Sequence, residues 1–266
     1  RSSKYAIRLA CRNHPDNFTA TIGFRVSLQK APDAGDLSFL KIEDWIIPSV
    51  GLEMIWCKPG TFLMGSPKDE PQREDNEFQQ KISINLGFFL GKYEITQQEY
   101  ETVMHTNPSK FKNKRLPVET VSLNDALNFC EKLTELERKR GNLTPGWVYK
   151  LPTEVQWEYA CRAGTNTRWS YGDSISLKDA NFAGDKKNDL KKTSEVGKYK
   201  PNPWGFYDMH GNVEEWCSGT SRQQNGVTRG GSFRSAWHRT RSATRQQTYT
   251  FKKHNTLGFR ISYQKK

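Results

Sequence analysis

Apolar and polar positions alternate along the middle of the chain in a pattern that predicts short strands. The segment EMIWCKPGTFLMGS, residues 53–66, places two alternating runs on either side of a Lys-Pro-Gly turn. The segment KISINLGFFLGKYEIT, residues 81–96, alternates in the same way. From Thr165 onward Gly, Asn, Pro and Trp are frequent and the helical period is lost, so we expect long loops on a small amount of sheet.

Three other stretches have helical spacing, and each follows a residue that can cap a helix. Thr96 precedes QQEYETVMHT, and Glu99 completes a capping box three residues further on. Ser122 precedes the clearest pattern, LNDALNFCEKLTELERKR, which has one apolar face and ends at Gly141. Thr153 precedes the shorter segment EVQWEYACRAG. The sequence therefore predicts three capped helices.

The first residues repeat a pattern found near the end of the sequence. Residues 1–27 line up with residues 234–262, and both segments close on Gly-Phe-Arg. We therefore divide the chain into a remnant of a second copy over residues 1–30, a connector over residues 31–50, and one folded domain over residues 51–266.

The net charge of +12 is unevenly distributed. Residues 216–266 hold 11 Lys and Arg and no acid, whereas residues 1–215 hold 30 Lys and Arg against 29 acids. A basic tail favours an anionic partner, and binding of nucleic acid or another polyanion is one alternative, although no nucleic-acid recognition motif accompanies it. The other interpretation is structural, with arginines that stack on rings and bind carbonyl oxygens inside the fold. The candidates for that role are Arg229, Arg241, Arg245 and Arg260.

Cysteine and histidine spacing argues against the common metal sites. The five cysteines form no CxxC pair, and the five histidines form no HExxH motif. We expect most of the cysteines to be small buried residues; they are Cys11, Cys57, Cys130, Cys161 and Cys217. No apolar run approaches the roughly 18 residues that a membrane-spanning helix needs.

Seven blocks, in order between about residues 52 and 261, resemble one family. They are PGTFLMGS, GKYEITQQEYETVM, LPVETVSLNDALNFC, YKLPTEVQWEYACRAG, PNPWGFYDMHGNVEEWC, RGGSF and LGFR. They are similar to the successive blocks of the formylglycine-generating-enzyme, or sulfatase-modifying-factor, family. The resemblance implies an α+β variant of the C-type-lectin fold, with a small mixed sheet, two main helices and many long loops.

The resemblance also bears on catalysis. In the enzymes of this family, two cysteines after the Gly-Gly-Ser block hold copper and oxidise a substrate cysteine to formylglycine, and soft thiolates suit Cu(I). Here the first position corresponds to Ser235, the second lies near Trp237, and no cysteine follows Cys217. A serine cannot replace a copper thiolate, so we expect no catalytic residue and no required cofactor. A copper oxidase remains the enzyme alternative.

The family carries calcium in its loops, and the segments ANFAGDKKNDL and HGNVEEW match those loops. The resemblance therefore implies Asn181, Asp189 and Asn212 as calcium ligands, with Asn188 as an alternative to Asp189, because calcium prefers oxygen ligands. The other interpretation is that residues 186–189 form only a solvated turn.

The block GNVEEWC contains two adjacent acids that do not form a catalytic pair. Adjacent residues of a strand face opposite sides, so Glu214 and Glu215 cannot act together in acid–base chemistry. Trp216 is expected to anchor the core.

The C-terminal segment, residues 229–260, carries the candidate binding surface. Outside its scaffold blocks it is rich in large, polar and aromatic residues, which give contact area at low entropic cost when they lie on rigid loops. It resembles the variable proteins of diversity-generating retroelements, a treponemal one among them, which place a mutable segment between RGGS and GFR. The candidate binding residues are Arg234, Ser235, Trp237, His238, Arg239, Gln246, Gln247, Tyr249, Phe251, Lys252 and Lys253.

These patterns predict a non-catalytic, receptor-like bacterial protein that binds a protein or an anionic ligand. The aromatic side chains would anchor the ligand and the cations would select polar or anionic partners. We expect no membrane span and a location at the cell surface or in the periplasm, with the cytoplasm left open.

Overall fold

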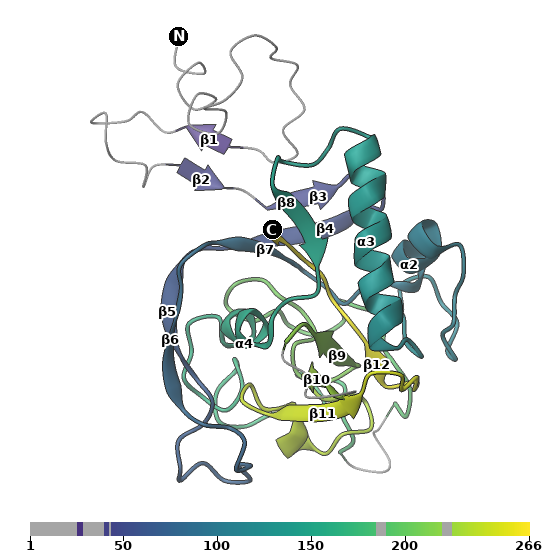
Figure 1. The fold of residues 1–266 in the computed structure, drawn as a ribbon. Coiled ribbons are helices and arrows are strands. Elements are labelled where there is room, and N and C mark those ends of the chain that lie inside the picture. Colours follow the sequence, from purple (N-terminus) through teal and green to yellow (C-terminus); the bar gives the residue numbers. More distant parts are fainter. Residues whose placement is uncertain (1–25, 29–39, 43, 185–189, 220–224) are drawn as a thin grey trace, which may run out of the picture.

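The computed structural model describes residues 26–28, 40–42, 44–184, 190–219 and 225–266, the first two of these ranges by their backbone alone. Within these residues the chain forms three α-helices, one short 3-10 helix and four small sheets, joined by long loops (Figure 1). The α+β class is confirmed. No helix of the described part is long and apolar enough to cross a bilayer. The predicted remnant over residues 1–30, with Cys11, falls almost entirely outside the described residues.

A five-stranded antiparallel sheet has its strands in the order β3-β4-β7-β13-β8. Their bounds are β3 (Trp45–Ile47), β4 (Leu52–Cys57), β7 (Phe88–Gly91), β13 (Ser262–Lys265) and β8 (Trp147–Lys150). The last strand of the domain, β13, lies between β7 and β8, so that Ser262 faces Leu90 on one side and Lys150 on the other. The sheet therefore joins the beginning, the middle and the end of the domain.

Part of the segment predicted as a connector, residues 31–50, belongs to this sheet. The edge strand β3 pairs Trp45 with Met54 of β4, and Trp45 and Ile47 are buried while Ile46 points outward. Three residues are too few for alternation to be recognised in the sequence. Two further short strands, β1 (Val26–Leu28) and β2 (Leu40–Ile42), pair with each other in a separate sheet.

All three predicted helices form, and each begins with a capping box. The helices are α2 (Gln97–Met104), α3 (Leu123–Lys139) and α4 (Glu154–Arg162). The hydroxyls of Thr96, Ser122 and Thr153 accept bonds from backbone N–H groups three residues further on, and the side chains at those positions bond back to the capping residues. In α4 this role belongs to Gln156. Local sequence therefore fixes the start of each helix.

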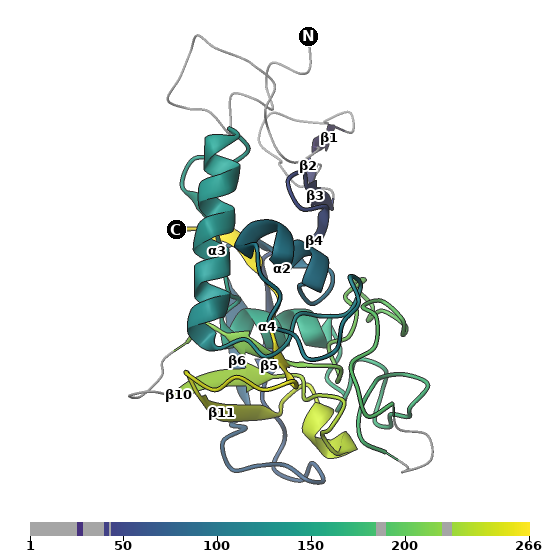
Figure 2. The same ribbon diagram turned by 90° about the vertical axis from the view of Figure 1, so that its right-hand side faces the viewer.

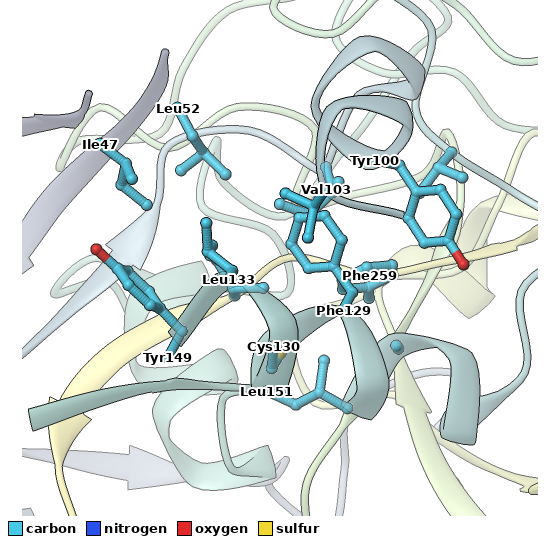
Figure 3. Close-up of a cluster of buried hydrophobic side chains, with 14 of the residues drawn as sticks. Ile47, Leu52, Tyr100, Val103, Phe129, Cys130, Leu133, Tyr149, Leu151 and Phe259 are labelled. Carbon is cyan, nitrogen blue, oxygen red and sulfur yellow. The ribbon is translucent and has the colours of Figure 1, made fainter. Parts of the chain in front are cut away.

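The main hydrophobic core lies where α3 meets α2 and the sheet (Figure 3). Phe129 of α3 stacks on Tyr100 of α2 with ring centroids 5.6 Å apart, and it meets Phe259 edge-on at 5.3 Å. Leu133 is fully buried one turn further along α3. Each such side chain contributes about 1.5–3 kcal/mol through burial, so the long helix is stabilised mainly by this apolar face.

A second, four-stranded sheet has the order β11-β10-β9-β12 and forms the other end of the domain. Its strands are β9 (Glu214–Cys217), β10 (Asn225–Arg229), β11 (Arg245–Tyr249) and β12 (Leu257–Gly258). A two-stranded hairpin of β5 (Gly60–Met64) and β6 (Gln80–Ile84) lies apart from it. The two strands predicted around the Lys-Pro-Gly turn are β4 and β5, and they belong to different sheets. Five short strands, β9 to β13, follow residue 165, and loops join them as predicted.

Helix α4 is enclosed on almost every side, which its sequence pattern did not predict. Trp157 and Ala160 point inward as expected, but Glu158 and Arg162 are buried as well. The two charged residues pair through Arg162 Nε and Glu158 Oε1 at 2.8 Å, and the Arg162 guanidinium also donates to the carbonyl of Gly65. A helix that is buried all round needs such internal partners for its charges.

Arg260 is a completely buried arginine that joins distant parts of the chain. Its Nε and Nη2 donate to the carboxylate of Glu215 at 2.6 and 2.7 Å, and it also donates to the carbonyls of Gly91 and Tyr207. Glu215 accepts a further bond from Trp157 Nε1 at 2.9 Å. The structural interpretation of this arginine is therefore confirmed.

We predict that Arg260→Leu lowers the free energy of unfolding by about 3–5 kcal/mol, because it leaves the Glu215 carboxylate buried without its cation. Urea denaturation of the purified protein measures this change. Arg168→Leu is the control: Arg168 lies 3.9 Å from Asp173, whose carboxylate is largely exposed, so the loss of this ion pair costs at most about 1 kcal/mol. Equal losses in the two variants would contradict the prediction.

Candidate ligand-binding surface

Arg241 attaches the C-terminal segment to the loop between β5 and β6. Its guanidinium donates to both carboxylate oxygens of Glu77 at 2.7 and 2.8 Å, to Glu70, and to the carbonyl of Gln72. Burial alone would raise the pKa of Glu77, but hydrogen bonds from Arg241 and Ser66 bring it below its usual value. The tip of the hairpin and the short helix η1 (Trp237–Thr240) consequently lie together at the lower end of the molecule in Figure 1.

Arg229, at the end of β10, fixes the backbone of the same segment from the other side. Its Nη1 donates to the carbonyls of Ser242 and Thr244, and its Nη2 pairs with Glu158 of α4. Arg245 is half-buried and pairs with Glu154. The four arginines proposed as structural therefore all have internal partners, three of them deep inside the fold.

His210 is a buried histidine that fastens η1 to a neighbouring loop. Its Nδ1 lies 2.8 Å from the carbonyl of Thr240, the last residue of η1, and its Nε2 lies 2.9 Å from the hydroxyl of Ser170 and 3.1 Å from the Ser170 backbone nitrogen. Since a carbonyl only accepts and an N–H only donates, Nδ1 carries the proton and the ring is neutral. Burial lowers the pKa of His210 to about 4, and Arg162 adds to this shift.

The candidate binding residues form a partly exposed surface around η1 and β11, which we call the C-terminal surface. Seven of them are exposed: Arg234, Trp237, Gln247, Tyr249, Phe251, Lys252 and Lys253. Trp237, Tyr249 and Phe251 are 40%, 58% and 67% exposed, and the last two rings stack 5.5 Å apart. Thr240 and Thr248 between them are buried. Fixed backbone therefore presents these aromatic side chains to solvent.

The other four candidates, Ser235, His238, Arg239 and Gln246, are half-buried. The Ser235 hydroxyl accepts a bond from a backbone N–H at 3.0 Å inside its own turn. Arg239 pairs with Glu74, and the exposed Lys253 pairs with Asp125 at 2.8 Å. Ser235, Arg239 and Lys253 therefore already have partners within the protein, and the surface offers fewer free cations than the sequence suggested.

Positive charge nevertheless gathers between η1 and the loop after β11. Burial raises the pKa of Glu214, and the nearby charges of Lys252 and Arg239 partly oppose that shift. Glu214 also accepts a bond from Thr228, while Glu215 points to the other side of β9, toward Arg260. The prediction that the two acids face opposite ways is confirmed, and Trp216 is a fully buried core residue as expected.

Lys110 lies near this surface, and no pattern in the sequence indicated it. The pKa of His254 is lowered by burial and then by Arg234, Lys252 and Lys110. Lys110 lies more than a hundred residues from the others in sequence, and only the fold brings it to them. Glu74 and Asp125, the ion-pair partners of the segment, were missed for the same reason.

A cavity of about 230 Å³ opens beside the C-terminal surface, between the β5–β6 hairpin and α4. Apolar side chains such as Met64, Phe78 and Val155 share its wall with Glu154 and Arg245. Phe78 is 71% exposed at its rim. The cavity is large enough for one side chain or a small polar group of a ligand.

The structure brings Asn181 and Asn212 together, as the predicted calcium site requires. The Asn212 Oδ1, however, already accepts bonds from the Ser194 backbone nitrogen at 2.9 Å, from the Ser194 hydroxyl and from Asn181 Nδ2. Asn212 Nδ2 donates to Glu94. These bonds do not fit Asn212 as a side-chain calcium ligand. Asp189 and its alternative Asn188 lie outside the described residues, so the calcium site stays a prediction.

The four cysteines of the described chain are buried and free of disulfides. Burial raises the pKa of Cys161 to about 12, so its thiol is protonated at neutral pH. The described residues contain no cluster of three or more His, Cys, Asp or Glu side chains arranged to hold a metal ion.

The fold and the site together define an α+β domain of the C-type-lectin-like kind that displays its C-terminal segment on a fixed frame. A family model described as a sulfatase-modifying factor enzyme 1-like domain matches residues 49–265, and the chain belongs to that family. The resemblance recognised in the sequence is confirmed at this level.

Curated relatives include both an active and an inactive enzyme type. The chaperone protein LppX of Paenibacillus barcinonensis is 32% identical over 171 residues, covering 49% of this chain and 61% of LppX. The mouse inactive C-alpha-formylglycine-generating enzyme 2 is 34% identical over 55% of this chain and 49% of that protein. The mouse formylglycine-generating enzyme is 24% identical over 79% and 74%. The chain therefore spans less than two thirds of LppX and about half of the inactive mouse protein.

Among solved structures, the variable protein 1 of Treponema denticola superposes with a TM-score of 0.67. The superposition covers 82% of this chain and 97% of the treponemal chain, at 23% sequence identity. Similarity at this level supports a shared fold.

We predict that His210 makes stability fall with acidity. Its pKa of about 4 in the folded protein lies below the ordinary 6.5, so the unfolded chain binds the proton first as the pH falls. The stability advantage is present above pH 6.5 and declines by on the order of 3 kcal/mol as the pH drops to 4. Urea denaturation at several pH values, on the wild type and on His210→Gln, measures it.

The comparison of wild type with His210→Gln isolates the titration of His210, because buried acids such as Asp208 and Glu94 are present in both proteins. We expect the difference in unfolding free energy between wild type and His210→Gln to shrink from pH 6.5 to pH 4. A difference that stays constant across that range would show that His210 does not titrate as described.

Proposed function

We propose that the protein is a non-catalytic, receptor-like module that binds a protein or anionic ligand through the C-terminal surface. The observation that carries the proposal is the contrast between Arg229 and Arg241, which are buried and hold the frame, and Trp237, Tyr249 and Phe251, which lie exposed on it. Aromatic side chains on a rigid backbone lose little entropy on binding. The nearby cations favour acidic or polar groups in the partner.

The absence of a cysteine at position 235 supports the non-catalytic assignment. The oxidase of the family needs two thiolates after the Gly-Gly-Ser block, and this chain has Ser235 at the first position. A formylglycine-generating oxidase remains the enzyme alternative, since one curated relative is such an enzyme. Turnover of a peptide with the sulfatase cysteine motif, in the presence of Cu(I), would overturn our choice.

Binding of nucleic acid through the basic tail is the second alternative, and we disfavour it. Of the tail's arginines, Arg229, Arg241 and Arg260 are buried and paired with acids. These charges therefore cannot reach phosphate groups. The proposed partner at this surface is a protein or an anionic ligand.

The similarity in fold to the treponemal variable protein supports a further suggestion, that the segment is diversified. Scaffold positions such as Arg241, Thr240 and Ser242 would have to stay constant, because their side chains lie inside the fold. Exposed positions such as Trp237, Gln247 and Tyr249 can change without altering the frame.

We predict that replacing Trp237, Tyr249 and Phe251 together by Ala weakens ligand binding without unfolding the protein. Peptides selected on the wild type from a random phage-displayed library serve as the probe. Their affinity should fall at least about tenfold for the triple variant, because the anchoring rings are gone. Isothermal titration calorimetry measures the affinity, and thermal melting checks the fold.

The matched control replaces Ile46 and Leu86, which are exposed apolar residues elsewhere on the protein, by Ala. This variant should bind the selected peptides as the wild type does. Selected peptides that bind the triple variant as tightly as the wild type would contradict the proposed site.

We further predict that sequencing the 3′ end of the gene from many cells of one culture finds substitutions confined to codons 234–256. Within that range they should fall at exposed codons such as 237, 247 and 249, and spare those of buried residues such as Thr240 and Arg241. A uniform sequence would leave a binding module of fixed specificity and would refute diversification.

A further inference from the structure

Two segments that are hydrogen-bonded to each other, residues 112–115 and 190–200, carry seven exposed cations. We call this set the basic face; its members are Lys112, Lys114, Arg115, Lys191, Lys192, Lys198 and Lys200.

The two segments are held together by hydrogen bonds. The Val196 backbone nitrogen donates to the carbonyl of Arg115 at 3.0 Å, and Asn113 Nδ2 donates to the carboxylate of Glu195 at 3.1 Å. Ser194 is buried and donates its N–H to Asn212. In Figure 2 the loop after α2 runs beside the green loops beyond α4. The cations therefore stand on a common, fixed backbone.

The positive charge of the basic face is not neutralised within the described part of the protein. None of its seven cations forms an ion pair with an acid of the described residues. Residues 112–115 and 190–200 contain one acid between them, Glu195, which accepts a hydrogen bond from Asn113. Such a concentration of one sign attracts an anionic partner over several ångströms.

The side chains of the basic face are suited to a charged surface rather than to base or sequence recognition. Its one arginine, Arg115, stacks over Tyr93 with its guanidinium carbon 5.7 Å from the ring centroid. Lys198 lies over the ring of Tyr199 at 5.9 Å. Because a cation already lies over each of these two rings, the rings are poor platforms for stacking by nucleobases. The other cations are lysines. A lysine ammonium acts as a point charge and lacks the planar guanidinium that binds one phosphate through two parallel hydrogen bonds.

One apolar side chain accompanies the lysines. Leu190 is 38% exposed and lies directly before Lys191 and Lys192. A leucine among lysines suits the boundary between lipid headgroups and acyl chains. There the lysines can contact phosphates and the leucine can contact methylene groups.

We propose that the basic face is a docking surface for a membrane rich in anionic phospholipids. The lysines bind headgroup phosphates through long-range charge attraction, at about 1 kcal/mol for each cation near the surface. Docking of this kind is peripheral, reversible and weakened by salt. None of its seven cations is among the candidate binding residues of the C-terminal surface.

Cosedimentation with lipid vesicles tests the proposal. We expect the protein to bind vesicles that contain phosphatidylglycerol and not vesicles of phosphatidylcholine alone, and added sodium chloride should release it. Replacing Lys191, Lys192, Lys198 and Lys200 together by Gln should lower vesicle partitioning at least about 100-fold. Thermal melting checks that the variant keeps the fold.

The matched control replaces Lys58, Lys68, Lys81 and Lys132 by Gln, which removes the same charge from exposed positions elsewhere. It should retain most of the vesicle binding. An equal loss in both variants would mean that net charge alone is responsible and would overturn the proposal. Equal binding to both lipids would overturn it too, as would tighter binding of double-stranded DNA, measured by fluorescence anisotropy, that is lost in the first variant.

Discussion

Buried arginine–glutamate pairs are the interaction on which the irregular half of this domain depends. The loops after α4 have few regular backbone ladders, so their positions rest on side chains that reach across the fold. Arg260 with Glu215, Arg229 with Glu158, and Arg241 with Glu77 each join segments far apart in the sequence. Ions of this kind are expensive to bury unless each has its partner. The arrangement is consequently specific, because a segment placed wrongly would leave a charge inside without a counter-ion.

A feature of the fold was predictable from the sequence when the residues that determine it lie close together in the chain. The starts of the helices at Thr96, Ser122 and Thr153 were predicted because a capping box lies within four residues. The sequence also indicated that Arg229 and Arg260 are structural, but their partners, Glu158 and Glu215, lie 71 and 45 residues away and could not be assigned. The outward direction of the aromatic side chains around η1 was anticipated from composition, whereas Lys110 and Glu74 came to that surface only through folding.

The distribution of charge was likewise only partly predictable from the sequence. In the sequence the last fifth of the chain carries the excess of positive charge. In the structure several of those arginines are neutralised inside the domain, and free positive charge appears instead on the loops around Arg115 and Lys198. Net charge counted along a segment therefore says little about the field outside a protein when the acids that neutralise it come from other segments. Two surfaces result, one rich in aromatic residues and one rich in lysine.

The place of β13 has a consequence for how the domain is made. This strand is the last of the domain, yet it lies between β7 and β8 rather than at an edge. The sheet cannot be completed until the final residues of the domain have left the ribosome, and its central contacts span more than a hundred residues of chain. Folding dominated by such distant contacts is slow. During synthesis β7 and α3 are made long before β13, so apolar surface stays exposed on the nascent chain, and exposed apolar surface of this kind favours aggregation.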